Sequence, residues 1–211
     1  MSIDIKKEKG HLVVLSGPSG VGKGTIGARL LAGHEDMCFS VSATTREIRE
    51  GEEEGVNYFY KTKEQFEEMI ANGEFLEYMQ VFGKNYYGTP RAYVEQKLSE
   101  GIDVLLDIDV QGAMVVKKNY PDALLIFIAP PSLEELYRRL VNRGTETLEA
   151  VERRFAQAKT EFTYVNNYDY VIINDDLELA VRDVESVLRT NELSSFEYKS
   201  AVFAALNAEA E

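Results

Sequence analysis

Four short stretches of the chain are apolar apart from Asp107: residues 12–15, 104–108, 124–128 and 170–173. Continuous apolar runs are typical of strands that are covered on both faces, whereas half-exposed strands alternate between apolar and polar residues. Residues 39–42 form a weaker fifth candidate. We expect these stretches to be the strands of one buried sheet.

The segments between the strands carry apolar residues at helical spacing and present charged outer faces. The expected helices are residues 24–31, 63–72, 91–100, 133–142, 148–166 and 177–193, with a last helix over 196–208. Strands and helices that alternate along a chain form parallel, doubly wound sheets. The predicted fold class is therefore α/β, with a five-stranded parallel sheet core flanked by helices.

Two regions interrupt this alternation. Residues 42–89 are rich in Tyr, Glu, Arg and Gly and contain short alternating pieces, which indicates a small, mainly β insertion with one helix. Residues 136 to about 160 are rich in Arg and are divided by Arg143-Gly144-Thr145. We expect two excursions from the core.

Composition narrows the function classes. With 36 acidic and 23 basic residues among 211, the formal net charge is −13, which argues against non-specific binding to nucleic acid or to anionic lipid. Cys38 is the only cysteine, so an intrachain disulfide is excluded and a reducing compartment is expected. Two histidines, His11 and His34, are too few for a His-rich zinc site.

The apolar runs are also too short for a membrane segment. The longest covers residues 123–131, and residues 1–10 are charged and lack the apolar stretch of a signal peptide. The sequence therefore predicts a cytoplasmic protein with no membrane partner.

Residues 16–25 read Ser-Gly-Pro-Ser-Gly-Val-Gly-Lys-Gly-Thr, between a predicted strand and a predicted helix. Glycines let the backbone wrap closely, so that successive N–H groups and the helix N-terminus face phosphate oxygens. The alternative is a glycine-rich turn, but the flanking elements and the lysine in register favour a phosphate-binding P-loop. The expected ligands of the ATP phosphates are Gly17, Pro18, Ser19, Gly20, Val21, Gly22, Lys23, Gly24 and Thr25.

One position departs from the P-loop pattern, which has Ser or Thr directly after the lysine to hold magnesium. Here that position is Gly24, followed by Thr25. Either Thr25 takes this role, or the ion keeps most of its water shell, which Mg²⁺ tolerates.

Further motifs follow the P-loop: residues 40–49 (SVSATTREIR), 51–58 (GEEEGVNY), 74–77 (EFLE), 85–89 (NYYGT), 106–112 (LDIDVQG) and 143–146 (RGTE). Their order and spacing closely resemble those of the guanylate kinase family, over about residues 12–188. The resemblance implies a P-loop nucleoside monophosphate kinase fold with a β-rich GMP-binding insertion and a helical lid. The implied divisions are core for 1–41, 91–135 and 161–211, insertion for 42–90 and lid for 136–160.

The resemblance also implies the acceptor site. The GMP phosphate would be held by Arg46, Arg49, Tyr58 and Tyr87, and the guanine by Ser42, Glu77 and Thr89 with help from Asp109. The chemistry agrees, since a carboxylate can accept from guanine N1–H and N2–H while a hydroxyl donates to O6. Adenine would leave the carboxylate unpaired, at a cost of roughly 1–3 kcal/mol.

Structural alternatives exist for these residues. The two arginines could pair with the acidic residues around them, Glu47, Glu50 and residues 52–54. Tyr86 and Tyr87 could both be packing aromatics, and we expect a binding role only for Tyr87.

Asp107 ends a predicted strand, where a carboxylate can face phosphate-bound magnesium through water. The alternative is a helix N-cap or a turn acid. Residues 109–112 also match the short DxxG string of GTPases, but no NKxD motif follows, so we reject that interpretation.

Arg139 and Arg143 are four residues apart and so share a helical face, and Arg154 follows eleven residues later. The resemblance places cationic lid residues at these three positions, where they would surround the transferring phosphoryl group. The alternative is pairing within the helix, as Glu134–Arg138 and Glu135–Arg139. Residues 174–176 (Asn-Asp-Asp) resemble the family's turn near the donor adenine, which implies that Asn174 lies on the adenine side.

The sequence hypothesis is therefore transfer of the ATP γ-phosphoryl to GMP, and to dGMP, in purine nucleotide metabolism. The catalytic residues would be Lys23, Arg139, Arg143 and Arg154, with Mg²⁺ held by Thr25 and Asp107, partly through water. Two rivals are a non-catalytic binding module of the same fold and a kinase for AMP or UMP. The presence of Lys23, Arg46 and Arg49 argues against the first, and Glu77 argues against the second. The expected partners are ATP and GMP and no nucleic acid; a homodimer is left open.

Overall fold

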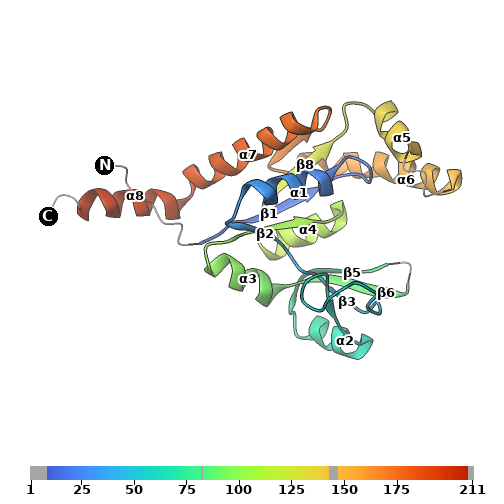
Figure 1. Ribbon diagram of the computed structural model, residues 1–211, viewed down its shortest axis with the longest axis horizontal. Helices are drawn as coiled ribbons and strands as arrows, with labels where there is room; N and C mark the ends of the chain where they lie inside the picture. Colours follow the sequence, from blue (N-terminus) through green and yellow to red (C-terminus); the bar gives the residue numbers. More distant parts are fainter. Residues whose placement is uncertain (1–8, 82, 143–146, 209–211) are drawn as a thin grey trace.

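The computed structural model describes residues 9–81, 83–142 and 147–208. Its central sheet has five parallel strands in the order β2-β7-β1-β8-β9 (Figure 1). Their bounds are β1 Leu12–Ser16, β2 Met37–Phe39, β7 Asp103–Asp107, β8 Leu124–Ala129 and β9 Tyr170–Ile173. Parallel strands end at one edge of a sheet, and the register pairs Leu15 with Asp107. The loop after β1 therefore lies beside the end of β7.

Helices cover both faces of this sheet. They are α1 Lys23–Gly33, α3 Arg91–Ser99, α4 Val110–Asn119, α5 Leu133–Asn142, α6 Leu148–Glu161 and α7 Leu177–Ser194, with a 3₁₀ segment η1 Phe162–Asn167. A last helix, α8 Phe196–Ala208, follows α7 beyond the sheet (Figure 1). Alternate residues of β1 enter different cores: Val13 and Leu15 pack with α1 and α7, whereas Leu12 and Val14 pack with α3 and α4. This two-sided burial explains the uninterrupted apolar run of β1.

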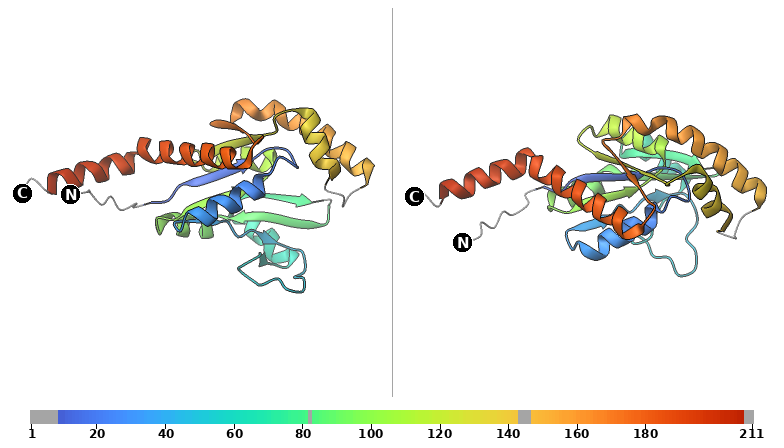
Figure 2. Two further views of the ribbon diagram at one scale, coloured as in Figure 1. Left: turned by 45° about the horizontal axis from the view of Figure 1, so that its top comes forward. Right: turned by 90° about the horizontal axis from the view of Figure 1, so that it is seen from above.

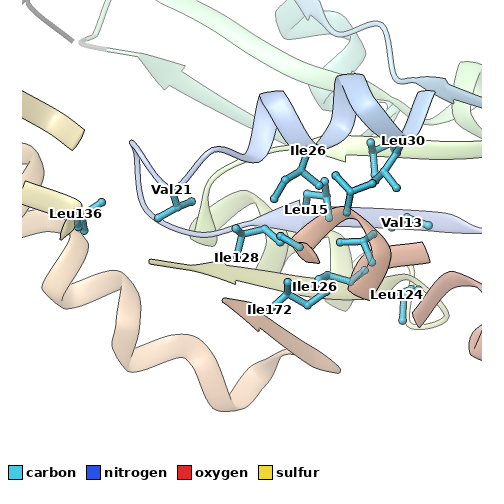
Figure 3. Packing of buried hydrophobic residues seen from close by; sticks show 14 of the residues in the cluster. Val13, Leu15, Val21, Ile26, Leu30, Leu124, Ile126, Ile128, Leu136 and Ile172 are labelled. Carbon is cyan, nitrogen blue, oxygen red and sulfur yellow. The ribbon is translucent and has the colours of Figure 1, made fainter. Parts of the chain in front are cut away.

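The first of these cores also anchors the loop that follows β1. Val21 of that loop is fully buried and lies in the same cluster as Ile128 of β8 and Leu136 of α5 (Figure 3). A buried apolar side chain in the middle of a glycine-rich loop limits the loop's freedom to move, because exposing it would lose its burial free energy.

Residues 43–90 form a second, smaller sheet with the strand order β4-β3-β6-β5, which lies below the core in Figure 1. Its elements are β3 Ala43–Thr44, β4 Phe59–Tyr60, α2 Lys63–Ala71, β5 Phe75–Val81 and β6 Asn85–Pro90. Phe66 of α2 stacks between Phe75 and Tyr86, with ring centroids 4.4 and 5.2 Å away. The α/β fold class, with a β-rich insertion on a five-stranded parallel core, is confirmed.

Two boundaries and one helix differ from the sequence prediction. The weak strand lies at Met37–Phe39 rather than at residues 39–42. The helix expected over 148–166 ends at Glu161 and continues as a 3₁₀ segment. Helix α4 was not predicted, because the polar motif of residues 106–112 covers its first turn; its signal is an Asp109 N-cap followed by apolar residues at helical spacing.

The prediction that residues 170–173 are covered on both faces was wrong. β9 is an edge strand, and Tyr170, Val171 and Ile173 are 39%, 49% and 57% exposed, whereas Ile172 is buried. An apolar run alone does not distinguish a central strand from an edge strand whose apolar face is open.

Helix α8 continues from α7 and projects away from the sheet (Figure 2). In the described part of the chain, every helix is too short or too polar to cross a membrane.

Candidate active site

The loop between β1 and α1 has the backbone conformation of a phosphate cradle. Gly17, Gly20 and Gly22 have φ values of 133°, 91° and 94°, which L side chains rarely adopt. A Cβ atom at Gly17 would collide with the carbonyl oxygen of Ile128. The Lys23 ammonium donates to the carbonyl oxygens of Gly17 and Pro18 at 2.7 and 3.3 Å, so the lysine folds back over the loop.

The buried residue Asn174 connects this loop to α5. Its side-chain Nδ2 donates to the Val21 carbonyl at 2.8 Å, and its backbone carbonyl accepts from Arg139 Nη1 at 2.9 Å. Asn174, predicted near the donor adenine, therefore connects the P-loop to α5.

Gly24 faces the end of β7. A Cβ atom placed on Gly24 would lie 3.4 Å from Asp107 Oδ2, and Thr25 is exposed on the same turn of α1. Desolvation raises the pKa of Asp107, and the nearby Lys23 charge opposes that rise. Asp107 does not cap a helix, since the N-cap of α4 is Asp109.

The Asp107 carboxylate and the Thr25 hydroxyl fit a magnesium ion that keeps part of its water shell, because Mg²⁺ prefers carboxylate, hydroxyl and water oxygens. Within residues 9–81, 83–142 and 147–208, no three His, Cys, Asp or Glu side chains gather closely enough to hold a metal by themselves.

Helix α6 turns one polar face toward the P-loop. A cavity of about 980 Å³ lies there, lined by Ser19, Thr147, Ala150, Arg153, Arg154, Gln157 and Glu161. Arg154 Nη1 donates to Ser19 Oγ at 3.0 Å, which brings this predicted arginine onto the P-loop.

Sequence reasoning missed Arg153, Gln157 and Glu161, although they follow one another at intervals of four residues, which marks one helix face. Glu161 is buried and accepts from Gln157 Nε2 at 2.8 Å. Burial raises the pKa of Glu161, and the bond from Gln157 and the Lys23 charge oppose that rise.

On α5, Glu135 pairs with both neighbouring arginines. Its oxygens lie 2.7 Å from Arg138 Nε and 2.7 Å from Arg139 Nε, and these pairs lower the pKa of Glu135 to about 2. The expected Glu135–Arg139 pair is present, whereas Arg138 pairs with Glu135 rather than with Glu134. Arg143 lies outside the described residues.

The small sheet brings together two of the predicted guanine ligands. Glu77 and Thr89 face each other across β5 and β6, and both side chains are buried. Thr89 Oγ1 donates to Glu77 Oε1 at 2.6 Å. Burial raises the pKa of Glu77, the Thr89 hydrogen bond lowers it, and the Asp109 charge raises it further.

The other predicted guanine contacts are less direct. Asp109 Oδ1 accepts from the Gly112 N–H at 2.8 Å and so caps α4, which leaves its second oxygen for other donors. Ser42 directly precedes β3, and its carbonyl accepts from the Phe59 N–H at 2.9 Å.

Beside these groups, the predicted phosphate ligands form an aromatic and cationic cluster. The Arg46 guanidinium lies 5.3 Å from the centre of the Tyr58 ring, and Tyr58 meets Tyr87 edge to face at 5.9 Å. Arg49 is exposed on the adjacent loop. Tyr86 packs on Phe66 in the small core, and the binding role expected of Tyr87 stays a prediction.

The arginines were also expected to have an alternative in the acidic loop, and one such pair is present. Arg46 Nη2 lies 2.7 Å from Glu52 Oε1. The sequence indicated Glu52 only as one of several carboxylates near Arg46.

Comparisons with known proteins agree with this geometry. The family model described as guanylate kinase matches residues 9–191. Among curated relatives, the guanylate kinase of Oceanobacillus iheyensis is 51% identical over 187 residues, covering 89% of this chain and 90% of the relative. That of Bacillus anthracis is 52% identical over 186 residues, covering 87% and 90%.

Solved structures lead to the same family. The crystal structure of guanylate kinase from Anaplasma phagocytophilum superposes with a TM-score of 0.68 at 37% identity, covering 91% of this chain and 90% of that one. A glycine-rich loop after β1 and a separate small sheet with a buried carboxylate are thus found in a chain that belongs to the guanylate kinase family.

Proposed function

We propose that this chain binds ATP at the P-loop and GMP in the 42–90 insertion, and transfers the γ-phosphoryl group between them to give ADP and GDP. Membership of the guanylate kinase family makes the chain an ATP:GMP phosphotransferase. We infer that dGMP is also accepted. The observation that carries the acceptor assignment is the buried Glu77 carboxylate with Thr89 beside it.

On the donor side, the backbone of residues 17–25 binds the ATP phosphates. Lys23 supplies a mobile positive charge for the transferred group, since its ammonium already lies against the loop carbonyls. The assignment of Asn174 to the adenine is kept as a proposal, and its bonds to Val21 and Arg139 support a position between the P-loop and the lid.

The acceptor needs no general base, because a nucleoside monophosphate is already anionic at pH 7. Catalysis then consists of aligning two anions that repel each other and of neutralising their charge. Arg154 and Arg139 are suited to this role, because one contacts the P-loop Ser19 and the other contacts Asn174. Arg143 belongs to the same proposal on sequence grounds.

We include Mg²⁺ as a cofactor of the donor nucleotide. Asp107 and Thr25 would hold it, mainly through water, and the bound ion would neutralise phosphate charge. The support is the placement of the Asp107 carboxylate against the first turn of α1.

On the acceptor side, Glu77 accepts from the guanine N–H groups, Thr89 and Ser42 contribute hydroxyls, and Asp109 adds a carboxylate oxygen. Arg46, Arg49, Tyr58 and Tyr87 bind the phosphate. The support is the clustering of Arg46 with Tyr58 and Tyr87 at the rim of the same small sheet.

The division into core, insertion and lid, with boundaries at residues 41, 90, 135 and 160, is part of this proposal. So are a cytoplasmic location and a homodimer.

The open apolar edge of β9 is the surface that supports the proposal of a homodimer, because a second copy could cover it. Light scattering of the purified protein tests whether the dimer forms.

The direct test is ADP release from ATP and magnesium with GMP, dGMP, AMP, UMP or CMP as acceptor. We expect turnover with GMP and dGMP only. Absence of GMP-dependent turnover would support the non-catalytic binding module, and equal turnover of AMP would refute the role given to Glu77.

A further inference from the structure

We propose that Glu52 is a positioning residue for the acceptor's phosphate group, holding the Arg46 guanidinium in the orientation that binds this phosphate. The inference rests on the proposed role of Arg46 as a phosphate ligand. It concerns an acidic residue inside an anion-binding site, where a carboxylate would ordinarily weaken binding.

Glu52 is held by three donors from three parts of the insertion. Its Oε1 accepts from Arg46 Nη2 at 2.7 Å. Its Oε2 accepts from the Arg49 backbone N–H at 2.8 Å and from the Tyr60 hydroxyl at 2.8 Å. Both oxygens are therefore used, and the carboxylate is fixed by the backbone and by β4 as well as by Arg46.

This arrangement also fixes Arg46 from several sides. Arg46 Nη1 donates to the Glu47 carbonyl at 2.8 Å, and the guanidinium lies 5.3 and 5.9 Å from the ring centres of Tyr58 and Tyr60. A guanidinium has five N–H donors. The bonds to Glu52 and Glu47 occupy two of them, so further donors remain for a phosphate.

The charge of Glu52 is maintained under ordinary conditions. Its bond from Arg46, followed by that from the Arg49 N–H, lowers the pKa of Glu52 to about 2. The same pair raises the pKa of Arg46 above its usual value. The carboxylate therefore remains ionised, and its charge is balanced by the arginine it orients.

Preorganisation explains why such a pair assists binding. An arginine side chain that is already ordered loses less rotamer entropy when a ligand arrives. Side chains of Arg46 and Glu52 are only 12% and 19% exposed, consistent with an ordered pair.

A competing role makes the opposite prediction. If Glu52 imitated the phosphate and had to be displaced by it, its removal would strengthen GMP binding. The bonds from the Arg49 N–H and from Tyr60 argue against this, because displacement would have to break them as well.

The test compares the dissociation constants of GMP and guanosine by calorimetry, since guanosine lacks only the phosphate. For Glu52→Gln we expect GMP to bind about 10-fold more weakly or worse, with guanosine unchanged. The matched control is Glu53→Gln, which removes the same charge from the neighbouring residue and should leave both constants within about twofold of wild type. Tyr60→Phe removes the hydrogen bond from the Tyr60 hydroxyl to Glu52 and should weaken GMP binding by a smaller factor. This variant serves as the test if Glu52→Gln does not fold.

Tighter GMP binding in Glu52→Gln would overturn the proposal, and so would equal weakening of GMP and guanosine. The variant Arg46→Ala distinguishes a failure of the positioning role of Glu52 from a failure of the proposed phosphate role of Arg46. If Arg46→Ala leaves the ratio of the two constants unchanged, the phosphate role of Arg46 itself is wrong. If Arg46→Ala changes the ratio and neither Glu52→Gln nor Tyr60→Phe does, only the positioning role fails.

Discussion

Thr89 Oγ1 donates a hydrogen bond of 2.6 Å to Glu77 Oε1, and both side chains are buried in the small sheet. A buried carboxylate whose donors are the Thr89 hydroxyl and the Thr89 backbone N–H is incompletely satisfied, because an ionised carboxylate can accept about four hydrogen bonds. Such a group is unfavourable for the stability of the unliganded protein. It is suited to a ligand that brings two adjacent N–H donors, as guanine does.

Glu77→Gln should therefore raise stability at neutral pH. The unfolded carboxyl has a pKa near 4.5, and burial raises the folded value, so the folded chain binds the proton more tightly. The destabilisation caused by Glu77 appears as the pH rises from 4.5 through the folded pKa, and it is complete above both. We expect the variant's free energy of unfolding at pH 7 to be higher by on the order of 1 kcal/mol.

Urea unfolding at several pH values measures this difference. The advantage of the variant should shrink as the pH falls through the raised folded pKa toward 4.5, and it should disappear below 4.5, where the wild-type carboxyl is protonated in both states. An advantage that does not change with pH would mean that the Glu77 charge is not its cause.

Lys23→Ala should reduce kcat far more than the affinity for GMP. The ammonium lies on the P-loop carbonyls, on the donor side of the site. Loss of one charge directed at the transferring group costs about 100-fold or more in turnover. The GMP dissociation constant should stay within about threefold of wild type, and Lys63→Ala, at an exposed pair with Glu67, is the control. A kcat equal to that of wild type would remove Lys23 from the mechanism.

Gly24→Ser should strengthen divalent cation binding. The new side chain would start 3.4 Å from Asp107 Oδ2 and would supply the hydroxyl that P-loops usually place after the lysine. Mn²⁺ binding in the presence of ADP, followed by paramagnetic resonance, should tighten several-fold in Gly24→Ser but not in Gly24→Ala. Asp107→Asn should weaken it. Identical affinities for the Ser and Ala variants would place the ion away from residue 24.

Asn174→Ala should destabilise the protein by about 1–3 kcal/mol, because the Val21 carbonyl loses the buried donor that lies 2.8 Å away. Thermal unfolding measures the change. Asn174→Asp, which keeps the size but cannot donate, should be destabilised similarly. If the aspartate variant keeps wild-type stability, the bond to Val21 contributes little.

The strands of the core were predictable because helices cover them on both faces of the sheet. The runs at residues 12–15 and 124–128, and residues 104–106 of the third run, are buried on both faces, which the absence of polar alternation indicates. The same signal failed for β9, where Val171 and Ile173 face outward from the sheet edge. Burial by a neighbouring strand depends on topology, and a local pattern does not contain it.

The candidate site was predictable where a motif fixes backbone geometry, as in the loop containing Gly17 and Lys23. It was less predictable where roles depend on contacts between distant segments. The bond from Arg154 to Ser19 joins residues 135 positions apart, and the Asn174 bond to Val21 joins residues 153 apart. Glu52 shows the same limit, since several nearby carboxylates could have paired with Arg46 and only the fold distinguishes them.

The central claim is that Glu77 selects the acceptor base, and the ratio of kcat/KM for GMP to that for AMP tests it most directly. We expect wild type to favour GMP by at least about 100-fold. Glu77→Gln should lose most of this preference because its kcat/KM for GMP falls, since an amide offers one acceptor oxygen where the carboxylate offers two. A Glu77→Gln variant with the wild-type ratio would contradict the account.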